Sequence, residues 1–253
     1  MIEQVVVSEL EGPECEARLN RYRVFDEVNA PYLRWQLAQI SENIGERVLE
    51  VGCGVGSILA QLGPRSAVMG IDLEDELIGY VRRRFAMDPA YSFATLDISR
   101  LSPIEMGMLK ARHFDSIVSI NVLEHVEDDE AAMRAMAGIV APGGYVSIVV
   151  PAHPALYGAY DRMEGHFRRY SRDGLRRLVA KSGLQLVKLH RFNALGALGW
   201  WVQYRLLRQT IHGQSHFKVL QAVMPVMWVI EGIVKPPFGL SLVAVARRPE
   251  NSV

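Results

Sequence analysis

The chain has 253 residues, of which 49% are hydrophobic and 22% charged, and its 28 lysines and arginines balance 28 aspartates and glutamates. This composition indicates one globular domain of the larger α/β kind and excludes collagen-like and disordered chains. The balanced charge argues for neither nucleic-acid nor membrane binding. Two cysteines, Cys15 and Cys53, are too few for a disulfide framework, and no signal-peptide pattern is apparent, so we expect a cytoplasmic protein.

Apolar residues recur at roughly helical spacing over residues 17–44, with a break at Pro31. We therefore expect residues 1–44 to form an N-terminal helical cap of two helices. From residue 45 onward, short β-rich runs alternate with helical patterns, which predicts βαβ units in a mainly parallel sheet. The expected strands are 47–51, 67–72, 91–96, 114–120, 145–150, 185–190 and 241–246, and the expected helices are 57–62, 75–85, 128–140 and 173–182.

A glycine-rich turn follows the first expected strand, in the run Glu50-Val51-Gly52-Cys53-Gly54-Val55-Gly56. Glycines allow a tight turn and let a ligand approach the backbone, and the next helix would offer free N–H groups. Asp72 ends the second expected strand, where a carboxylate can accept both hydroxyls of a ribose. Asp97 ends the third, where it can meet the exocyclic amine of a purine. Because parallel strands end at one crevice, the three features together predict an adenosine site.

Other interpretations of these features remain open. The turn would also serve simply to connect a strand to a helix, and a lone aspartate at a strand end is often a helix cap. A nicotinamide dinucleotide site calls for GxGxxG, whereas this chain has Gly52-x-Gly54-x-Gly56 followed by Ser57. The acidic Glu50 ahead of the turn disfavours a pyrophosphate and suits a cationic amino-acid tail.

Two further motifs follow, Ser-Ile-Asn-Val-Leu-Glu-His-Val at 119–126 and Ile-Val-Ala-Pro-Gly-Gly at 139–144. Together with the glycine-rich turn and the two aspartates, they resemble the motifs of the class I S-adenosylmethionine-dependent methyltransferases over roughly residues 45–190. The resemblance implies a Rossmann-like α/β fold with a seven-stranded, mostly parallel sheet and helices on both faces. The last strand would run antiparallel between two parallel neighbours. It also implies S-adenosyl-L-methionine as cofactor, held by Glu50, Gly52, Cys53, Gly54, Gly56, Asp72, Leu73, Asp97, Ile98, Asn121 and Val122.

Methyl transfer from a sulfonium is an in-line displacement, which needs accurate positioning and, for a hydroxyl acceptor, a base. The run 151–171 follows the fifth expected strand, where loops carry acceptor-binding residues on such scaffolds. Alternatively, this run caps the next helix and packs its aromatic side chains. The catalytic candidates are His125, His153, His166 and Tyr170, and the acceptor-binding candidates are Tyr157, Arg168, Arg169 and Trp200.

Two further patterns bear on ligands. Similar quinone-pathway O-methyltransferases have a glutamate three positions before a Glu-His pair and bind a divalent metal with the trio; Asn121 stands there in this chain, so we expect no metal site. Residues 162–191 hold nine lysines or arginines against two acids, which favours an anionic substrate, a phospholipid surface or merely a solvated helix face. No nucleic-acid-reading motif accompanies them, so we expect no nucleic-acid partner.

An apolar insertion, residues 193–239, precedes the last expected strand. Its charge-free runs, 192–204 and 219–230, are shorter than the roughly 20 residues of a membrane-spanning helix. It is open to three interpretations: helices packed on the core or on a second copy, a lid over an apolar acceptor, or an interfacial membrane anchor. The dimer or peripheral membrane contact would run through residues 193–234.

The resemblance thus implies a methyltransferase domain over residues 45–253 that methylates a small-molecule acceptor, with apolar, anionic, lipid-linked and sugar-linked acceptors all left open. The alternative is a non-catalytic nucleoside-binding or scaffold protein on the same fold.

Overall fold

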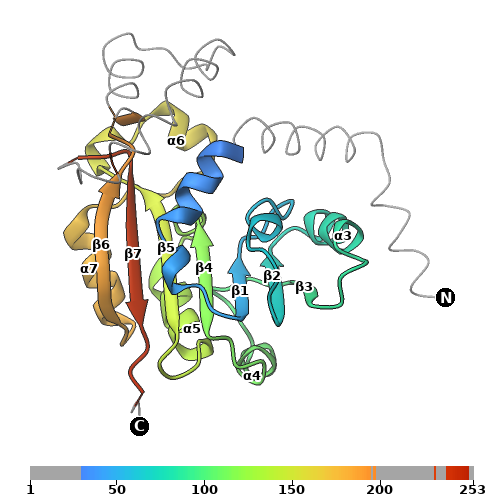
Figure 1. The fold of residues 1–253 in the computed structure, drawn as a ribbon. Coiled ribbons are helices and arrows are strands. Elements are labelled where there is room, and N and C mark those ends of the chain that lie inside the picture. The colour runs from blue at the N-terminus through green and yellow to red at the C-terminus, as the bar shows by residue number, and fades with distance from the viewer. Residues whose placement is uncertain (1–29, 195, 198–230, 232–237, 251–253) are drawn as a thin grey trace.

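A seven-stranded sheet runs through the middle of the computed structural model, which describes residues 30–194, 196–197, 231 and 238–250 (Figure 1). The strands lie in the order β3-β2-β1-β4-β5-β7-β6. They are β1 (Arg47–Val51), β2 (Ala67–Asp72), β3 (Tyr91–Thr95), β4 (Ser116–Ile120), β5 (Tyr145–Pro151), β6 (Gln185–Phe192) and β7 (Ser241–Arg247).

The pairing of the strands confirms the predicted fold class. Strands β1 to β5 pair in parallel, whereas β7 is antiparallel to both of its neighbours, β5 and β6. The last strand is therefore inserted between two parallel strands, as expected. The bounds of every expected strand are within two residues of those observed.

The helices are α3 (Asp75–Arg84), α4 (Pro103–Lys110), α5 (Asp129–Ile139), α6 (Ala159–Met163) and α7 (Arg172–Lys181). Helices α3, α5 and α7 confirm three expectations, while α4 and α6 were not predicted. Helix α4 begins with a capping box: the Ser102 hydroxyl accepts from the Glu105 N–H, and Pro103 occupies the first turn. Short 3-10 turns are η1 (Ser41–Asn43), η2 (Leu59–Gln61), η3 (Leu123–His125) and η4 (Pro154–Leu156).

The prediction of a helix over residues 57–62 was wrong in length. Only the single turn η2 forms there. Gly63 has a φ of +70° and Pro64 follows it, so the chain cannot continue the helix. Any ligand at the glycine turn would therefore meet backbone N–H groups of the turn itself and no helix dipole.

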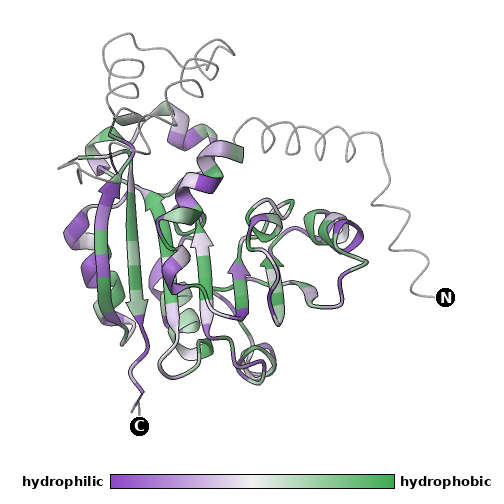
Figure 2. Cartoon of the chain, in the orientation of Figure 1, coloured by the Kyte–Doolittle hydropathy of each residue, from purple (hydrophilic) through white to green (hydrophobic). Residues whose placement is uncertain are grey.

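Two hydrophobic layers cover the sheet, one on each face. Alternate residues of the strands point to opposite faces, so Leu49 packs with α4, α5 and α7, whereas Val48 packs with α3, η2 and the helical residues 30–38. Figure 2 shows the hydrophobic residues along the strands and the hydrophilic ones on the outer sides of the helices. Both faces are covered, which is why the central strands read as continuous apolar runs.

Only part of the N-terminal cap and of the apolar insertion is described. Residues 30–38 are helical, and Trp35 and Ile40 are buried against the sheet. Residues 1–29, most of 193–239 and the acceptor-binding candidate Trp200 lie outside the described residues, so the boundaries of cap and insertion stay predictions. Among the described residues, no helix is long and apolar enough to cross a membrane.

Candidate functional site

The turn after β1 has a backbone that requires glycine. Gly52, Gly54 and Gly56 have φ values of +72°, +52° and +79°. A Cβ on Gly52 would lie 2.4 Å from a methyl group of Val122, whereas one on Gly54 would meet none of the described residues within 4 Å. The turn is thus closely packed at Gly52 and open at Gly54, which leaves space for a ligand against the backbone.

Asp72, at the end of β2, faces this turn. Its carboxylate accepts a hydrogen bond from the Gly54 N–H at 2.9 Å and one from the Glu74 N–H at 3.2 Å. The two bonds fix the side chain at the carboxyl end of the sheet. Leu73, the next residue, is 63% exposed and offers an apolar surface beside it.

The other predicted cofactor residues lie at the ends of neighbouring strands. Asp97 follows β3 and accepts from both the N–H and the hydroxyl of Ser99. Asn121 follows β4 with a φ of +55°, and its amide exchanges 3.4 Å hydrogen bonds with Gln36 of the helical residues 30–38. Glu50, Cys53 and Ile98 are buried.

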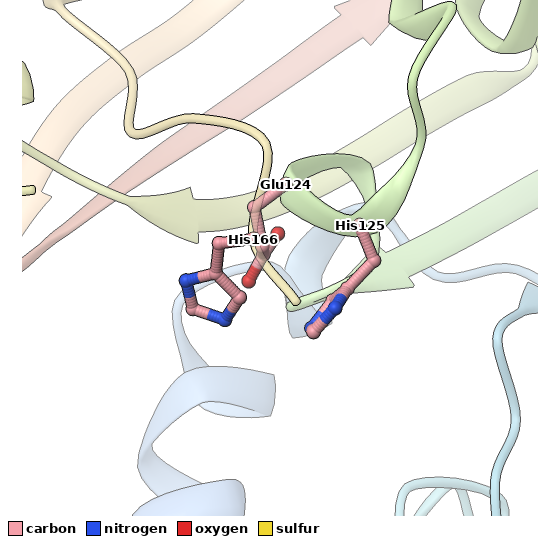
Figure 3. Close-up of side chains that lie close together, drawn as sticks. All are labelled: Glu124, His125 and His166. Atoms are coloured by element: carbon pink, nitrogen blue, oxygen red, sulfur yellow. The ribbon is translucent and has the colours of Figure 1, made fainter. Parts of the chain in front are cut away.

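A second group of side chains lies beyond Asn121, where η3 meets the loop after α6. Glu124, His125 and His166 offer ligand atoms that all lie within 4.8 Å of one another. Figure 3 shows the three side chains pointing toward one another from two separate segments. The rings of His125 and His166 are 4.6 Å apart and nearly perpendicular. We call these three residues the Glu-His-His cluster.

Burial shifts the pKa values of Glu124 and His125 in this cluster. Glu124 is 1% exposed, and its burial raises its pKa to about 8. Desolvation, together with the neighbouring His166, lowers the pKa of His125 to about 4, so its imidazole is neutral at pH 7.

Asp161, on α6, hydrogen-bonds to the ring nitrogen of His166 that points away from the cluster. Its carboxylate accepts from His166 Nδ1 at 2.9 Å, from Arg169 Nε at 2.7 Å and from the Gly158 N–H at 2.9 Å. Burial opposes ionisation of Asp161, but these hydrogen bonds and the Arg169 charge outweigh it and lower its pKa. Because Nδ1–H of His166 donates to the carboxylate, Nε2 is left as the acceptor atom that faces the cluster.

The loop 153–170 is fastened to η3 by several hydrogen bonds. The Phe167 N–H donates to the Glu124 carbonyl at 2.7 Å, and the Tyr170 hydroxyl donates to the Leu123 carbonyl at 3.0 Å. Tyr170 also bonds to Asp129, and burial with this carboxylate raises its pKa. These bonds hold two segments that are about forty residues apart in the sequence in one fixed arrangement.

The predicted acceptor-binding residues of this loop make contacts within the protein. The Tyr157 hydroxyl donates to the His166 carbonyl at 2.7 Å. Arg168 forms an ion pair with Asp129 at 2.9 Å, and Arg169 is buried against Asp161. Each of them therefore positions the loop.

Of the three predicted histidines, the structure brings two together. His153 lies elsewhere: its ring bonds to the Gly239 backbone, and burial first, then the nearby Arg191, lowers its pKa. The sequence reasoning missed Glu124, Asp161 and Gln36 as site residues. Glu124 stood in the noticed Glu-His pair, whereas nothing local in the sequence marks Asp161 as the partner of His166.

The order of the strands, the antiparallel β7 and the glycine turn facing Asp72 define a Rossmann-like fold of the class I methyltransferase type. Residues 20–189, about two thirds of the chain, match the family model described as a methyltransferase domain. The protein therefore belongs to this family, that of the class I S-adenosylmethionine-dependent methyltransferases.

Curated relatives match over part of their length. The ubiquinone biosynthesis O-methyltransferase of Aeromonas salmonicida is 29% identical over 138 residues, 54% of this chain and 56% of the relative. That of Thiobacillus denitrificans is 31% identical over 129 residues, 50% of this chain and 53% of the relative. The chain thus spans about half the length of the curated relatives it matches.

Solved structures share the fold over almost the whole chain. The N-methyltransferase NodS from Bradyrhizobium japonicum, in complex with S-adenosyl-L-homocysteine, is 21% identical with a TM-score of 0.54, covering 98% of both chains. A methyltransferase in complex with the Trm112 activator from Haloferax volcanii is 17% identical with a TM-score of 0.64, covering 94% of this chain and 97% of that one. At these identities the likeness concerns the fold alone.

Proposed function

We propose that the protein transfers a methyl group from S-adenosyl-L-methionine to a hydroxyl of a small-molecule acceptor. The observation that carries the proposal is the turn at Gly52–Gly56 with its open backbone at Gly54, facing a fixed Asp72. Family membership supports methyl transfer, and the names of the curated relatives support a hydroxyl acceptor. We expect the reaction to take place in the cytoplasm or at a membrane surface.

The residues around the turn fit the parts of this cofactor. Asp72 would accept the two ribose hydroxyls, because its oxygens already lie at the edge of the turn. Asp97 would accept from the adenine amine, with Leu73 and Ile98 beside the ring. Glu50, Cys53, Asn121 and Val122 would lie toward the amino-acid end, where an acidic group suits an ammonium.

The cofactor supplies an electrophilic methyl group on a sulfonium, and the protein has to position the acceptor oxygen in line with it. The acceptor's proton must also leave. His125 lies just beyond the end of β4 and is neutral, and His166, beside it, is held in one tautomer by its hydrogen bond to Asp161. This pair would therefore take up the proton, either directly or through a group bound to it. Tyr157, Arg168, Arg169 and Tyr170 would hold the loop in place.

Calorimetry with S-adenosyl-L-homocysteine tests the cofactor site. We expect Asp72→Ala to weaken binding by about tenfold or more, equivalent to about 1.4 kcal/mol. The matched control is Asp88→Ala, because Asp88 likewise accepts a hydrogen bond from the backbone but precedes β3, at the opposite edge of the sheet from the end of β2. Equal affinities of the two variants would contradict the ribose role of Asp72.

A second experiment separates the enzyme from the non-catalytic alternative. Cell extract is incubated with the protein and an isotopically labelled methyl donor, and mass spectrometry follows the label. Transfer to any small molecule supports the proposal. Cofactor binding without transfer, over a broad panel of acceptors, would favour a nucleoside-binding scaffold.

A further inference from the structure

The Glu-His-His cluster combines three side chains that are common metal ligands in one small space. Two imidazoles and one carboxylate form the ligand set of many catalytic zinc sites and of other divalent transition-metal sites. Glu124 and His125 come from η3, and His166 comes from the loop after α6 (Figure 3). A set of this kind, drawn from two segments and converging on one point, is what a metal site requires.

One oxygen of Glu124 has no hydrogen-bond partner among the residues that the structure describes. The side chain is 1% exposed, and its Oε2 accepts no hydrogen bond from them. Leaving a buried carboxyl oxygen without a hydrogen bond is destabilising, so a native fold rarely keeps one without reason. This oxygen belongs to the cluster, and a cation bound there would satisfy it.

Asp161, the hydrogen-bond partner of His166, is the kind of group that orients a metal-binding histidine. A histidine that binds a metal usually donates its other ring N–H to a carboxylate, which fixes the tautomer and the ring. Asp161 accepts from His166 Nδ1 at 2.9 Å and is itself held by Arg169 and the Gly158 N–H. Nε2 of His166 is therefore directed to the cluster with its lone pair available.

The charges around the cluster also suit a cation. Asp161 and Arg169 form a buried ion pair at 2.7 Å and offset each other. Arg168, the next cation along the loop, is paired with Asp129. Glu124 is then the acidic group of the cluster that remains for a cation, and a divalent ion would supply the countercharge of its carboxylate.

We propose that Glu124, His125 and His166 form a site for a divalent transition-metal ion, for which Zn²⁺ is the probe. The expectation of no metal site rested on Asn121 standing in place of a glutamate. Asn121 bonds to Gln36 and takes no part in the cluster. The third ligand comes instead from His166, which lies outside that motif.

Binding needs a modest adjustment. Ligand atoms on a tetrahedral ion with bonds of about 2.1 Å lie about 3.4 Å apart, closer than the 4.8 Å within which the cluster's atoms now lie. Glu124 and His166 are fixed by burial and by Asp161. His125 is the most exposed of the three, so rotation of its side chain would close the site and leave a coordination position open to solvent.

The role of the ion rests on the proposed function. An acceptor hydroxyl bound at the open position would lose its proton to solvent near neutral pH, because a divalent ion lowers the pKa of bound oxygen. The oxygen would then form a bond to the methyl carbon as the carbon–sulfur bond breaks, and the sulfonium would become a neutral thioether.

Metal binding is measured on the purified full-length chain by competition between the protein and a chromophoric chelator for Zn²⁺. We expect one tight site per chain, and we expect His125→Gln and His166→Gln each to weaken it by at least about tenfold. The matched control is His153→Gln, which removes a histidine from the same loop but outside the cluster and should leave the affinity unchanged. The control is needed because the chain has seven histidines in all.

Binding of S-adenosyl-L-homocysteine to each variant checks that it is folded, and His125→Gln, an exposed position, keeps the test independent of folding. Zn²⁺ bound equally by wild type, His125→Gln and His166→Gln would overturn the proposal, as would the absence of a stoichiometric site in the wild type. Loss of Zn²⁺ with intact S-adenosyl-L-homocysteine binding in the variants supports it. A wild type that binds Zn²⁺ but no S-adenosyl-L-homocysteine would overturn the proposed function while leaving the metal site standing.

Discussion

The buried ion pair between Asp161 and Arg169 predicts a large effect of a very small change. Asp161→Asn keeps the shape of the side chain but removes its charge, which leaves the guanidinium of Arg169 buried without its counter-ion. Both side chains are at most 2% exposed. Removing one partner of such a pair costs about 3–5 kcal/mol of unfolding free energy. In a domain of this size, that corresponds to a fall in Tm of about 6–20 °C.

The control is Asp173→Asn, because Asp173 also pairs with an arginine, Arg176, at 2.9 Å but is 72% exposed. An exposed pair contributes about 0–1 kcal/mol. Urea unfolding in the presence of EDTA, followed by circular dichroism, gives the midpoint and slope for both variants and excludes a contribution from bound metal. Equal losses of unfolding free energy in Asp161→Asn and Asp173→Asn would refute the argument that burial determines how much an ion pair stabilises the fold.

Three further changes test the packing. Gly52→Ala should abolish tight binding of S-adenosyl-L-homocysteine, because its Cβ would come 2.4 Å from a methyl group of Val122. Gly63→Ala is the control: Gly63 has a similar positive φ but open space among the described residues, so the affinity measured by calorimetry should not change. Ser102→Ala should cost about 1 kcal/mol in urea unfolding by removing the cap of α4. Phe114→Ala should cost about 3–5 kcal/mol, and the exposed Ile104→Ala less than about 0.5 kcal/mol; similar values for these two would contradict the assigned core.

The sheet was predictable because its strands carry their signals locally. The runs that form β1 and β2 are apolar, rich in β-branched residues and bounded by glycines or acidic residues, and both were predicted with the bounds observed. Helix α4 also carried a local signal, the Ser102-Pro103-x-Glu105 pattern, but its hydrophobic face is too short to stand out from a loop.

The Glu-His-His cluster was not predictable in the same way. His125 and His166 were both candidates, but their closeness depends on the bond from the Phe167 N–H to the Glu124 carbonyl, which joins distant parts of the chain. His153 lies in the same loop as His166 and has the same chemistry, yet its ring bonds to Gly239. Sequence distance could not distinguish these two histidines, because the path of the loop decides which of them faces η3.

The position of β7 has a consequence for the synthesis of the protein. Strand β6 lies at the end of the sheet and pairs only with β7 among the described strands, and β5 meets β7 along its whole length. A nascent chain that has not yet emerged beyond residue 241 therefore carries two unsatisfied strand edges, which are prone to pair with other chains. Completion of the sheet has to wait until residues 241–247 have left the ribosome, and termination before them would leave an aggregation-prone product.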